Sequence, residues 1–398
     1  MDPLGIYIHI PYCIKKCRYC DFVSFEKAPR DEYFEGLALD IGRAGKVLAE
    51  TEKSAGNAGF KPSADTVFFG GGTPSLAGEK QLRTVLDAVR NAFSLCPADG
   101  MDGPEITIEV NPETVTQKKA EELKRLGFDR VSMGVQSLDD RVLSAMGRVH
   151  SAERARQAYR ILRDAGFGNI NLDLIFGAPM ADAGNAACAQ TLAVWQETLD
   201  EVLELKPEHL SFYSLQLEEP TPLYKDYRDG LVQLPSWEEN RAMYHYAAKR
   251  VKEAGYDHYE VSNAALPGFE CRHNLKYWTM QPYLGFGTSA HSFTGLLRGE
   301  ADWSGKDSSA EGSAFGLDPE SREDLIGDYV FTQLRLTEGT DSALYSRLFG
   351  TVFEEDFSIP LKKLIKDGFI EPSRKGFRLT SKGLDNTNNV IRELLEIL

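Results

Sequence analysis

The order of apolar and polar positions predicts six strand-then-helix units along the first two thirds of the chain. Short stretches with strand-like alternation or continuous apolar character are each followed by a segment with apolar positions at helical spacing. The predicted strand and helix pairs are 5–10 with 31–50, 64–69 with 79–93, 105–111 with 116–126, 130–136 with 152–165, 169–176 with 186–205, and 209–217 with 237–254. Such alternation predicts a parallel sheet covered by helices on its outer side. We therefore expect an α/β fold with a partial (βα)6 TIM-like barrel, and a full eight-unit barrel is the alternative.

The pattern changes after residue 297. Residues 298–322 are rich in small polar side chains and predict a flexible connector. Residues 323–398 predict three helices, two short strands around a turn and a closing helix, which resembles a winged-helix-like α+β domain. From Leu325 onward, 10 Lys and Arg residues stand against 11 Asp and Glu residues, so no basic DNA-recognition face is indicated. The predicted organisation is a barrel with a substrate region over residues 1–297, the connector over 298–322, and the C-terminal domain over 323–398.

Composition and charge narrow the class of protein. A length of 398 residues with 42% hydrophobic and 26% charged residues is ordinary for a soluble chain of about two domains. There is no apolar run of about 18 residues and no basic-then-apolar leader at the start, so we expect a cytoplasmic protein without an integral membrane segment. The net charge of −15 argues against broad binding to nucleic acids or anionic membranes.

Three of the six cysteines, Cys13, Cys17 and Cys20, follow the first predicted strand with the spacing C-x3-C-x2-C. Three thiolates can anchor three irons of a [4Fe–4S] cluster and leave the fourth iron for an exchangeable ligand. A zinc site completed by His9 or a distant residue, or unrelated buried thiols, are the alternatives. A disulfide would need an oxidising compartment, which nothing in the sequence indicates. Aromatic residues beside Cys20 favour the cluster, because a reactive cluster benefits from a water-poor surrounding.

This cysteine spacing resembles the radical S-adenosylmethionine (SAM) superfamily. In that superfamily the amino and carboxylate groups of SAM chelate the fourth iron, and an electron from the cluster cleaves the sulfonium. After the second predicted strand, a run of three glycines precedes Thr73, and glycine lets backbone N–H groups approach a ligand closely. A plain strand-to-helix turn is the alternative. The resemblance implies that Gly71, Gly72 and Thr73 bind the amino group of SAM.

The alternation of side chains along the predicted strands adds three candidate ligand-binding residues. Glu109, Gln136 and Asp173 come late in three successive predicted strands, each on the face opposite bulky apolar residues. Barrels place their chemistry at the C-terminal ends of strands, so we expect these side chains to converge on a polar ligand such as the ribose and methionyl groups of SAM. The alternative is that each caps a neighbouring loop. The resemblance adds Arg148 as the partner of the SAM carboxylate, and Tyr7 and Tyr19 complete the expected SAM-binding set.

Further motifs narrow the resemblance. The sequence Tyr-Ile-His-Ile-Pro at the start, Cys-Asp-Phe, Gly-Gly-Gly-Thr-Pro and His-Asn-x-x-Tyr-Trp from His273 to Trp278 together resemble the HemW heme-chaperone family over essentially the whole chain. That family is close kin to oxygen-independent coproporphyrinogen III dehydrogenase. The dehydrogenases usually carry a further cysteine two positions after the last ligand, where this chain has Phe22.

The resemblance implies a heme site at the His-Asn-x-x-Tyr-Trp motif. A neutral imidazole is a good axial ligand, so His273 is the candidate for heme iron, with Tyr277 and Trp278 against the macrocycle. Cys271 is an alternative thiolate ligand. Residues 283–291 are predicted to be a loop with a glycine-rich turn, which brings His291 near the SAM or substrate pocket. Cys96 and Cys188 are interpreted as ordinary buried thiols.

The functional expectation is a chaperone that binds a [4Fe–4S] cluster, SAM and heme and delivers heme to acceptor hemoproteins, with no catalytic residue assigned. A reductant of the flavodoxin or ferredoxin type would suit it, and its oligomeric state stays open between monomer and homodimer. One alternative is a true radical SAM enzyme that oxidatively decarboxylates coproporphyrinogen III. Another alternative is a zinc- or nucleic-acid-binding scaffold. The excess of acidic over basic residues argues against it.

Overall fold

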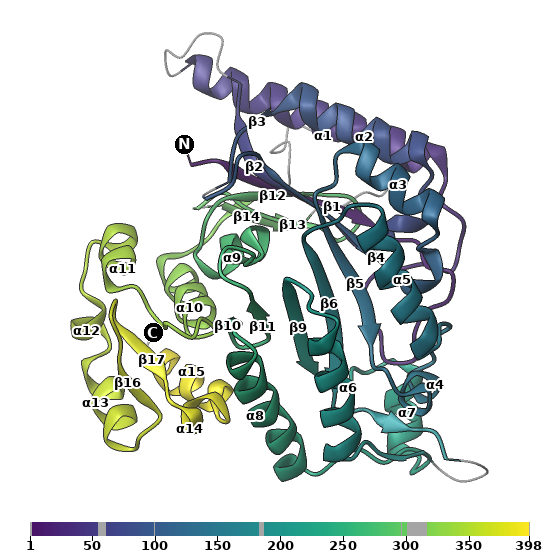
Figure 1. Cartoon of the computed structure of the whole chain (residues 1–398). Coiled ribbons are helices and arrows are strands. Elements are labelled where there is room, and N and C mark those ends of the chain that lie inside the picture. The colour runs from purple at the N-terminus through teal and green to yellow at the C-terminus, as the bar shows by residue number, and fades with distance from the viewer. Residues whose placement is uncertain are drawn as a thin grey trace.

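A partial barrel of parallel strands forms the main body of the molecule (Figure 1). The computed structural model describes residues 2–54, 61–98, 100–182, 187–295, 297–300 and 317–397. Seven neighbouring strands run parallel, in the spatial order β9 (His209–Ser214), β6 (Ile170–Phe176), β5 (Arg130–Gln136), β4 (Glu105–Val110), β2 (Ser63–Gly71), β1 (Leu4–Ile10) and β12 (Tyr283–Phe286). Six of these are the strands expected from the alternation, so the α/β fold with a partial barrel is confirmed.

Antiparallel strands extend the sheet at both edges. At one edge, β11 (Asn263–Ala265) pairs with β9, and β10 (Asp257–Glu260) pairs with β11. At the other edge, β12 is followed by β13 (His291–Phe293), β14 (Leu297–Glu300) and β15 (Asp318–Pro319). The short β3 (Ser94–Leu95) pairs with β2.

Helices cover the outer side of the curved sheet (Figure 1). They are α1 (Asp31–Ser54), α2 (Glu79–Ala92), α3 (Gln117–Leu126), α5 (Ala152–Asp164), α6 (Leu192–Glu204) and α8 (Trp237–Glu253). Four of them begin at a Ser or Thr whose hydroxyl accepts a hydrogen bond from a backbone N–H of the first turn, at Thr116, Ser151, Thr191 and Ser236. Such caps satisfy donors that the helix itself cannot and typically contribute about 1 kcal/mol each.

The two faces of the strands differ in chemistry. Ile6, Ile8 and Ile10 of β1 are fully buried within the main hydrophobic cluster, which also contains residues of the outer helices. Burying each such side chain is worth about 1.5–3 kcal/mol. The alternate positions face the barrel interior, where Asn171 donates to Asp173 over 2.8 Å and to the hydroxyl of Ser132 over 2.8 Å. A polar network therefore occupies the barrel interior, where apolar layers fill a complete TIM barrel.

Two details of the sequence interpretation are wrong. Residues 283–286 were expected in a loop, but they form β12, which pairs in parallel with β1 from Gly5 to Ile8. Gly285 permits this, because a Cβ there would lie 2.3 Å from the carbonyl oxygen of His291 on the returning strand. The helix expected to start at residue 186 starts at Leu192, because residues 188–189 form the small strand β8 against β7 (Pro179–Met180).

The C-terminal residues pack around a separate hydrophobic cluster. The elements are α10 (Arg322–Gln333), α11 (Ser342–Phe349), α12 (Phe353–Asp356), α13 (Ser358–Lys366), β16 (Ile370–Pro372), β17 (Phe377–Leu379), α14 (Ser381–Leu384) and α15 (Thr387–Leu395). Tyr329, Tyr345 and Phe353 are fully buried at its centre. The two short strands lie between helices as expected for the winged-helix-like part, but within residues 317–397 four helices precede them instead of three, and two short helices follow instead of one. Residues 301–316 of the expected connector lie outside the described residues.

Polar contacts attach this part to the barrel. Asp385 accepts a hydrogen bond from Nε of Arg241 on α8 over 2.7 Å and lies 3.0 Å from Nε2 of His245. Gln333 of α10 donates to the carbonyl oxygen of Trp278 over 2.6 Å, at the end of α9 (Arg272–Trp278). In the ranges that the structure describes, no helix combines the length and apolar character needed to cross a membrane.

Candidate cluster and ligand site

The cysteine loop leaves β1 and is fixed by backbone hydrogen bonds at both ends. The N–H of Cys13 donates to the carbonyl of Phe25 over 2.9 Å, and the N–H of Phe25 donates to that of Pro11 over 2.7 Å. Further along, the N–H of Arg18 donates to the carbonyl of Met146 over 3.1 Å, next to α4 (Asp140–Ala145). The loop therefore adopts one conformation in which Cys13, Cys17 and Cys20 are free, partly exposed thiols.

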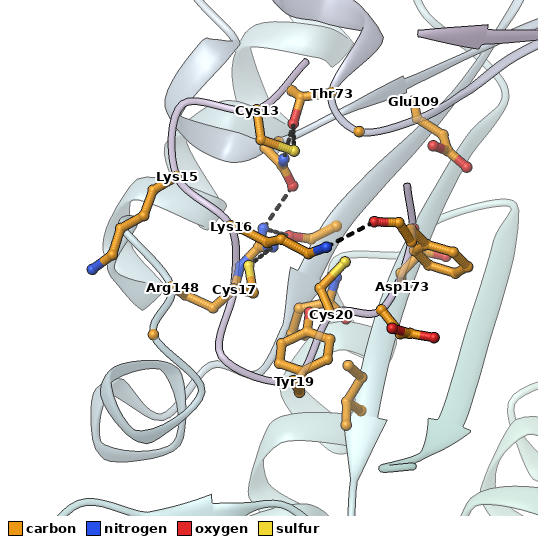
Figure 2. Close-up of a pocket in the computed structure, with 18 of the residues that line it drawn as sticks. Cys13, Lys15, Lys16, Cys17, Tyr19, Cys20, Thr73, Glu109, Arg148 and Asp173 are labelled. Carbon is orange, nitrogen blue, oxygen red and sulfur yellow. Dashed lines mark hydrogen bonds between the residues drawn. The ribbon is translucent and has the colours of Figure 1, made fainter. Parts of the chain in front are cut away.

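The three thiols line a cavity of about 620 Å³ at the C-terminal ends of the strands (Figure 2). Eleven of the thirteen residues expected at the site line it, namely Cys13, Cys17, Tyr19, Cys20, Gly71, Gly72, Thr73, Glu109, Gln136, Arg148 and Asp173. Figure 2 shows Glu109 and Asp173 on the sheet side of the cavity, across from the cysteine loop. Gln136 has the uncommon positive φ of 66°, a backbone strain often found at ligand sites.

The glycine run after β2 is required by close packing. A Cβ on Gly72 would lie 2.6 Å from the carbonyl oxygen of Tyr12 in the cysteine loop, so no other residue fits there without displacing that loop. Gly71 has a φ of +114°, which side-chain-bearing residues rarely adopt, and its N–H donates to the carboxylate of Glu109 over 3.0 Å. These glycines bring β2, β4 and the cysteine loop together at one point.

Arg148 connects the cysteine loop with the strands. Its Nη1 donates to the sulfur of Cys17 over 3.2 Å, and its Nη2 donates to Oδ1 of Asn111 over 2.6 Å and to the carbonyl of Gly134 over 2.8 Å. Asn111 in turn donates to the hydroxyl of Thr73 over 2.8 Å. Within the described residues, Nε of Arg148 is buried without a hydrogen-bond partner, which leaves one donor of the guanidinium for a ligand in the cavity.

Burial makes the acidic groups of the cavity prefer their neutral forms. Burial, together with repulsion from Asp173, raises the pKa of Glu109 to about 8. Burial likewise raises the pKa of the Asp173 carboxyl and of the Cys13 and Cys20 thiols. A cationic group or a metal in the cavity would favour ionisation of all of them, because opposite charge stabilises the charged form. The cavity is thus electrostatically suited to a positively charged ligand.

Three free thiols are the donor set that three irons of a [4Fe–4S] cluster take. Within the described ranges, no group of three or more His, Cys, Asp or Glu side chains lies close enough together to hold one metal ion. Tetrahedral zinc needs its ligands within about 2.0–2.3 Å of one point, whereas a cubane cluster is several ångströms across and takes more widely spaced thiolates.

Tyr7 and His273 lie apart from this cavity. Both line a smaller cavity of about 220 Å³ in the barrel interior, which shares Glu109 and Asp173 with the larger one. Burial raises the pKa of Tyr7 well above its usual value, so its hydroxyl stays protonated. Tyr7 therefore lies beside the expected SAM region rather than on its surface.

His273 is fully enclosed and both of its ring nitrogens are occupied. Nδ1 lies 2.9 Å from the hydroxyl of Thr66, and Nε2 lies 2.8 Å from the hydroxyl of Tyr277. Its side chain is 1% exposed, and burial lowers its pKa to about 3. Iron ligation by His273 stays a prediction, and it would require the ring to give up one of these hydrogen bonds and the helix to open around it.

Cys271 is a poor candidate for a thiolate ligand in this conformation. It is completely buried, its sulfur lies 3.7 Å from a carboxylate oxygen of Glu105, and burial raises its pKa to about 12.

The sequence analysis did not list Asn111 and Ser132 as site residues, although both line the cavity that contains the three thiols. Strand parity could have found both, because they share a face with Glu109 and Gln136, respectively.

Comparisons with known proteins agree with this geometry. The family model described as the radical SAM superfamily matches residues 7–186, and that of the HemN C-terminal domain matches residues 321–385. The chain is 33% identical to the heme chaperone HemW of Bacillus subtilis, over 95% of each chain. It is 30% identical to the heme chaperone HemW of Escherichia coli, over 99% of each chain.

A solved structure shares the fold. The structure titled coproporphyrinogen III oxidase (HemN) from Escherichia coli, a radical SAM enzyme, superposes with a TM-score of 0.78 at 24% sequence identity. The match covers 100% of this chain and 91% of that chain. This likeness concerns the architecture, including the C-terminal helices and strands that follow the barrel.

Proposed function

The chain belongs to the HemW family of radical SAM heme chaperones, and from this premise we propose that it binds a [4Fe–4S] cluster, SAM and heme and delivers heme to acceptor hemoproteins. The observation that carries the proposal is the convergence of three free thiols, a guanidinium and two carboxyls on one cavity at the strand ends.

In this proposal Cys13, Cys17 and Cys20 hold the cluster. Bound there, a cluster of this kind supplies one-electron chemistry and an open iron for an exchangeable ligand. Arg148 keeps Cys17 in place through the hydrogen bond from its Nη1 to the sulfur. Thr73 lies 3.8 Å from the sulfur of Cys13 and steadies it in the same way as a weak donor.

SAM would occupy the rest of the cavity. Glu109 and Asp173 would bind its cationic and hydroxyl groups, and Gly71 and Gly72 would let the backbone approach it closely. The unpartnered Nε of Arg148 is a donor for its carboxylate. Gln136 and Tyr19 would contact SAM from the remaining walls of the cavity. Tyr7 of β1 would support the site from the adjoining smaller cavity.

The rim of the cysteine loop suits an acidic electron donor. Lys15 is exposed on the cysteine loop (Figure 2), where it helps to line the cavity, and Ile14 beside it is 54% exposed. Flavodoxin- or ferredoxin-type reductants are small acidic proteins, so positive and apolar groups at this rim would favour their docking.

We also propose cytoplasmic residence and a division of the chain into three parts. These are a barrel over 1–297, a connector over 298–322 and a C-terminal domain over 323–398, and the separate hydrophobic cluster supports the C-terminal domain.

Heme transfer is the test. The protein is reconstituted anaerobically, loaded with heme and mixed with an apo-hemoprotein, and transfer is followed by the absorbance of the acceptor. Faster acquisition than from free heme, lost in Cys17→Ala, would support the proposal, and acquisition no faster than from free heme would contradict it. In parallel, reductant, SAM and coproporphyrinogen III are added. Protoporphyrinogen above the Cys17→Ala control would instead indicate the oxidative decarboxylase.

A further inference from the structure

A second large cavity lies beside the cluster cavity. Its volume is about 670 Å³, within the range of roughly 300–1,000 Å³ in which proteins bury a ligand of drug size. It lies between the cysteine loop, β1 and the β12–β13 edge of the sheet. Asp21 and Phe22 line both this cavity and the cluster cavity, so the two are neighbours.

Aromatic rings form much of its wall. Tyr7, Phe22, Tyr277 and Tyr283 line it, and Tyr277 packs edge-on against Tyr283 with ring centroids 4.5 Å apart. Phe22 is 72% exposed, so a ligand that covers its phenyl ring would remove apolar surface from water. A flat, largely apolar ligand would cover this ring and find faces and edges of aromatic side chains around it.

His291 supplies a metal ligand at the same wall. All seven histidines of the chain lie in the described ranges. Six have at least one ring nitrogen in a hydrogen bond to another group of the protein, at His9, His150, His209, His245, His258 and His273. His291 is exposed on β13, lines the cavity, and has no such bond within the described residues. It is therefore the histidine whose ring nitrogens are available to iron.

The backbone holds His291 in place. The turn before it packs against β1, because a Cβ on Gly287, whose φ is +100°, would lie 2.7 Å from the carbonyl oxygen of His9. Ser289, which also lines the cavity, has a positive φ of 57°. On the other side, His291 pairs with Glu300 of β14. A ligand on such a fixed support loses little freedom when it binds iron.

We propose that heme, the cargo of the proposed function on which this inference rests, binds in this cavity with His291 as an axial ligand of its iron. The macrocycle lies against Tyr283 and Phe22, while His273 stays inside the barrel and supports Tyr277 through its Nε2 hydrogen bond. Arg298 lines the cavity but already pairs with Glu320 and Asp328, so the propionates point toward the open side and water.

Heme titration tests the assignment with a readout that does not depend on chaperone activity. Wild type, His291→Ala and His273→Ala are titrated with ferric heme, and the Soret band and electron paramagnetic resonance spectrum report the axial ligand. His245→Gln is the matched control, since His245 is also partly exposed but pairs with Asp385 far from the cavity. We expect His291→Ala to lose the histidine-ligated spectrum and bind heme at least tenfold more weakly, and added imidazole to restore the spectrum. His245→Gln should match wild type.

Each other outcome overturns the inference. A wild-type spectrum and affinity in His291→Ala would place the ligand elsewhere, and loss of the histidine signature in a folded His273→Ala alone would assign it to that residue. Phe22→Ala, a change at an exposed position, should weaken heme binding without changing the axial ligand. Unchanged affinity would show that the macrocycle does not contact Phe22. If wild type binds no heme at all, the proposed function fails together with the inference, and the wild-type titration shows this directly.

Discussion

Nη1 of Arg148 donates a hydrogen bond to the sulfur of Cys17 over 3.2 Å, although the two residues are 131 positions apart in the chain. The same guanidinium binds Asn111 and the carbonyl of Gly134 at the ends of β4 and β5. One side chain therefore connects the cysteine loop to the strand ends that carry the other residues of the cavity. Disturbing it should affect the cluster and its neighbouring ligand together.

Removal of one cluster thiol is the first prediction. Cys17→Ala should abolish the absorbance near roughly 400 nm that thiolate-to-iron charge transfer gives in reconstituted protein, because two remaining thiolates cannot hold the cubane. Visible absorbance and iron content measure this. Cys188→Ala is the control, since Cys188 lies on β8 outside the cavity and should leave both unchanged. A brown Cys17→Ala protein with full iron content would refute the ligand assignment.

Arg148→Lys should retain the charge but lose the forked geometry. Lysine has one nitrogen, so it cannot reach Cys17, Asn111 and Gly134 together and leave a further donor for a carboxylate. We expect roughly tenfold weaker SAM binding, on the order of 1.4 kcal/mol, measured by calorimetry on cluster-loaded protein. The exposed Arg160→Lys is the matched control. Equal affinity in both variants would mean that Arg148 does not bind the ligand.

Gly72→Ala should displace the cysteine loop. The added Cβ would meet the backbone of Tyr12 at 2.6–3.0 Å, and backbone cannot move away as a flexible side chain can. We expect a cost on the order of 1–3 kcal/mol and impaired cluster assembly, measured by thermal unfolding and iron content. Gly42→Ala, in the interior of α1 with nothing within 4 Å of its new Cβ, should be neutral or stabilising by up to about 1 kcal/mol. A normally assembling Gly72→Ala would show that the loop tolerates a shift.

Stability of the ligand-free protein should fall as the pH rises from 5 to 8. Because the pKa of Glu109 is about 8 in the folded chain and 4.5 in the unfolded reference, the unfolded chain releases a proton that the folded chain keeps over this window. Stability from this group is complete below pH about 4.5 and is lost as the pH approaches 8. Glu109→Gln should reduce the loss of unfolding free energy between pH 5 and 8 by about 1–2 kcal/mol. The effect stays this small because the cavity is partly open to water.

Urea denaturation at pH 5, 6.5 and 8 measures this slope. Glu121→Gln, at an exposed position of α3, is the control and should retain the wild-type decline. An equally steep decline in Glu109→Gln would mean that Glu109 is ionised in the folded protein at neutral pH. The decline that remains in Glu109→Gln should reflect Asp173, whose pKa burial also raises.

One carboxylate contributes to the attachment of the C-terminal part to the barrel. Asp385 binds Arg241 and His245 of α8 and is largely shielded from water. Asp385→Asn should lower the free energy of unfolding by about 1–2 kcal/mol, because a charge-assisted pair is replaced by a neutral one beside a buried cation. Limited proteolysis and denaturant unfolding measure it, and the exposed Asp367→Asn is the control. An unchanged protease pattern and midpoint would show that the other contacts, among them the hydrogen bond from Gln333 to the carbonyl of Trp278, hold the part in place without Asp385.

Much of the fold follows from local pattern. The alternation of strands and helices determined the parallel sheet, since the period of side chains is a property of the backbone and needs no knowledge of the partners. The same parity placed Glu109 and Asp173 on the interior face of their strands, where they line one cavity. Residues 283–286 escaped this reasoning because two of the three residues after Leu284 are glycines, and only pairing with β1 makes the segment a strand.

The sequence by itself determined which side chains could carry chemistry: the closely spaced thiols, the glycine run and the late polar positions of the strands. Only the tertiary structure decided which of them meet. It brought Arg148 to Cys17 and enclosed His273 between two hydroxyls. It also placed His291 at an aromatic cavity, without a hydrogen bond to its ring from any described residue. The physical reason is that spacing fixes neighbours within a few residues, whereas burial and hydrogen-bond partners arise from packing between segments far apart in the chain.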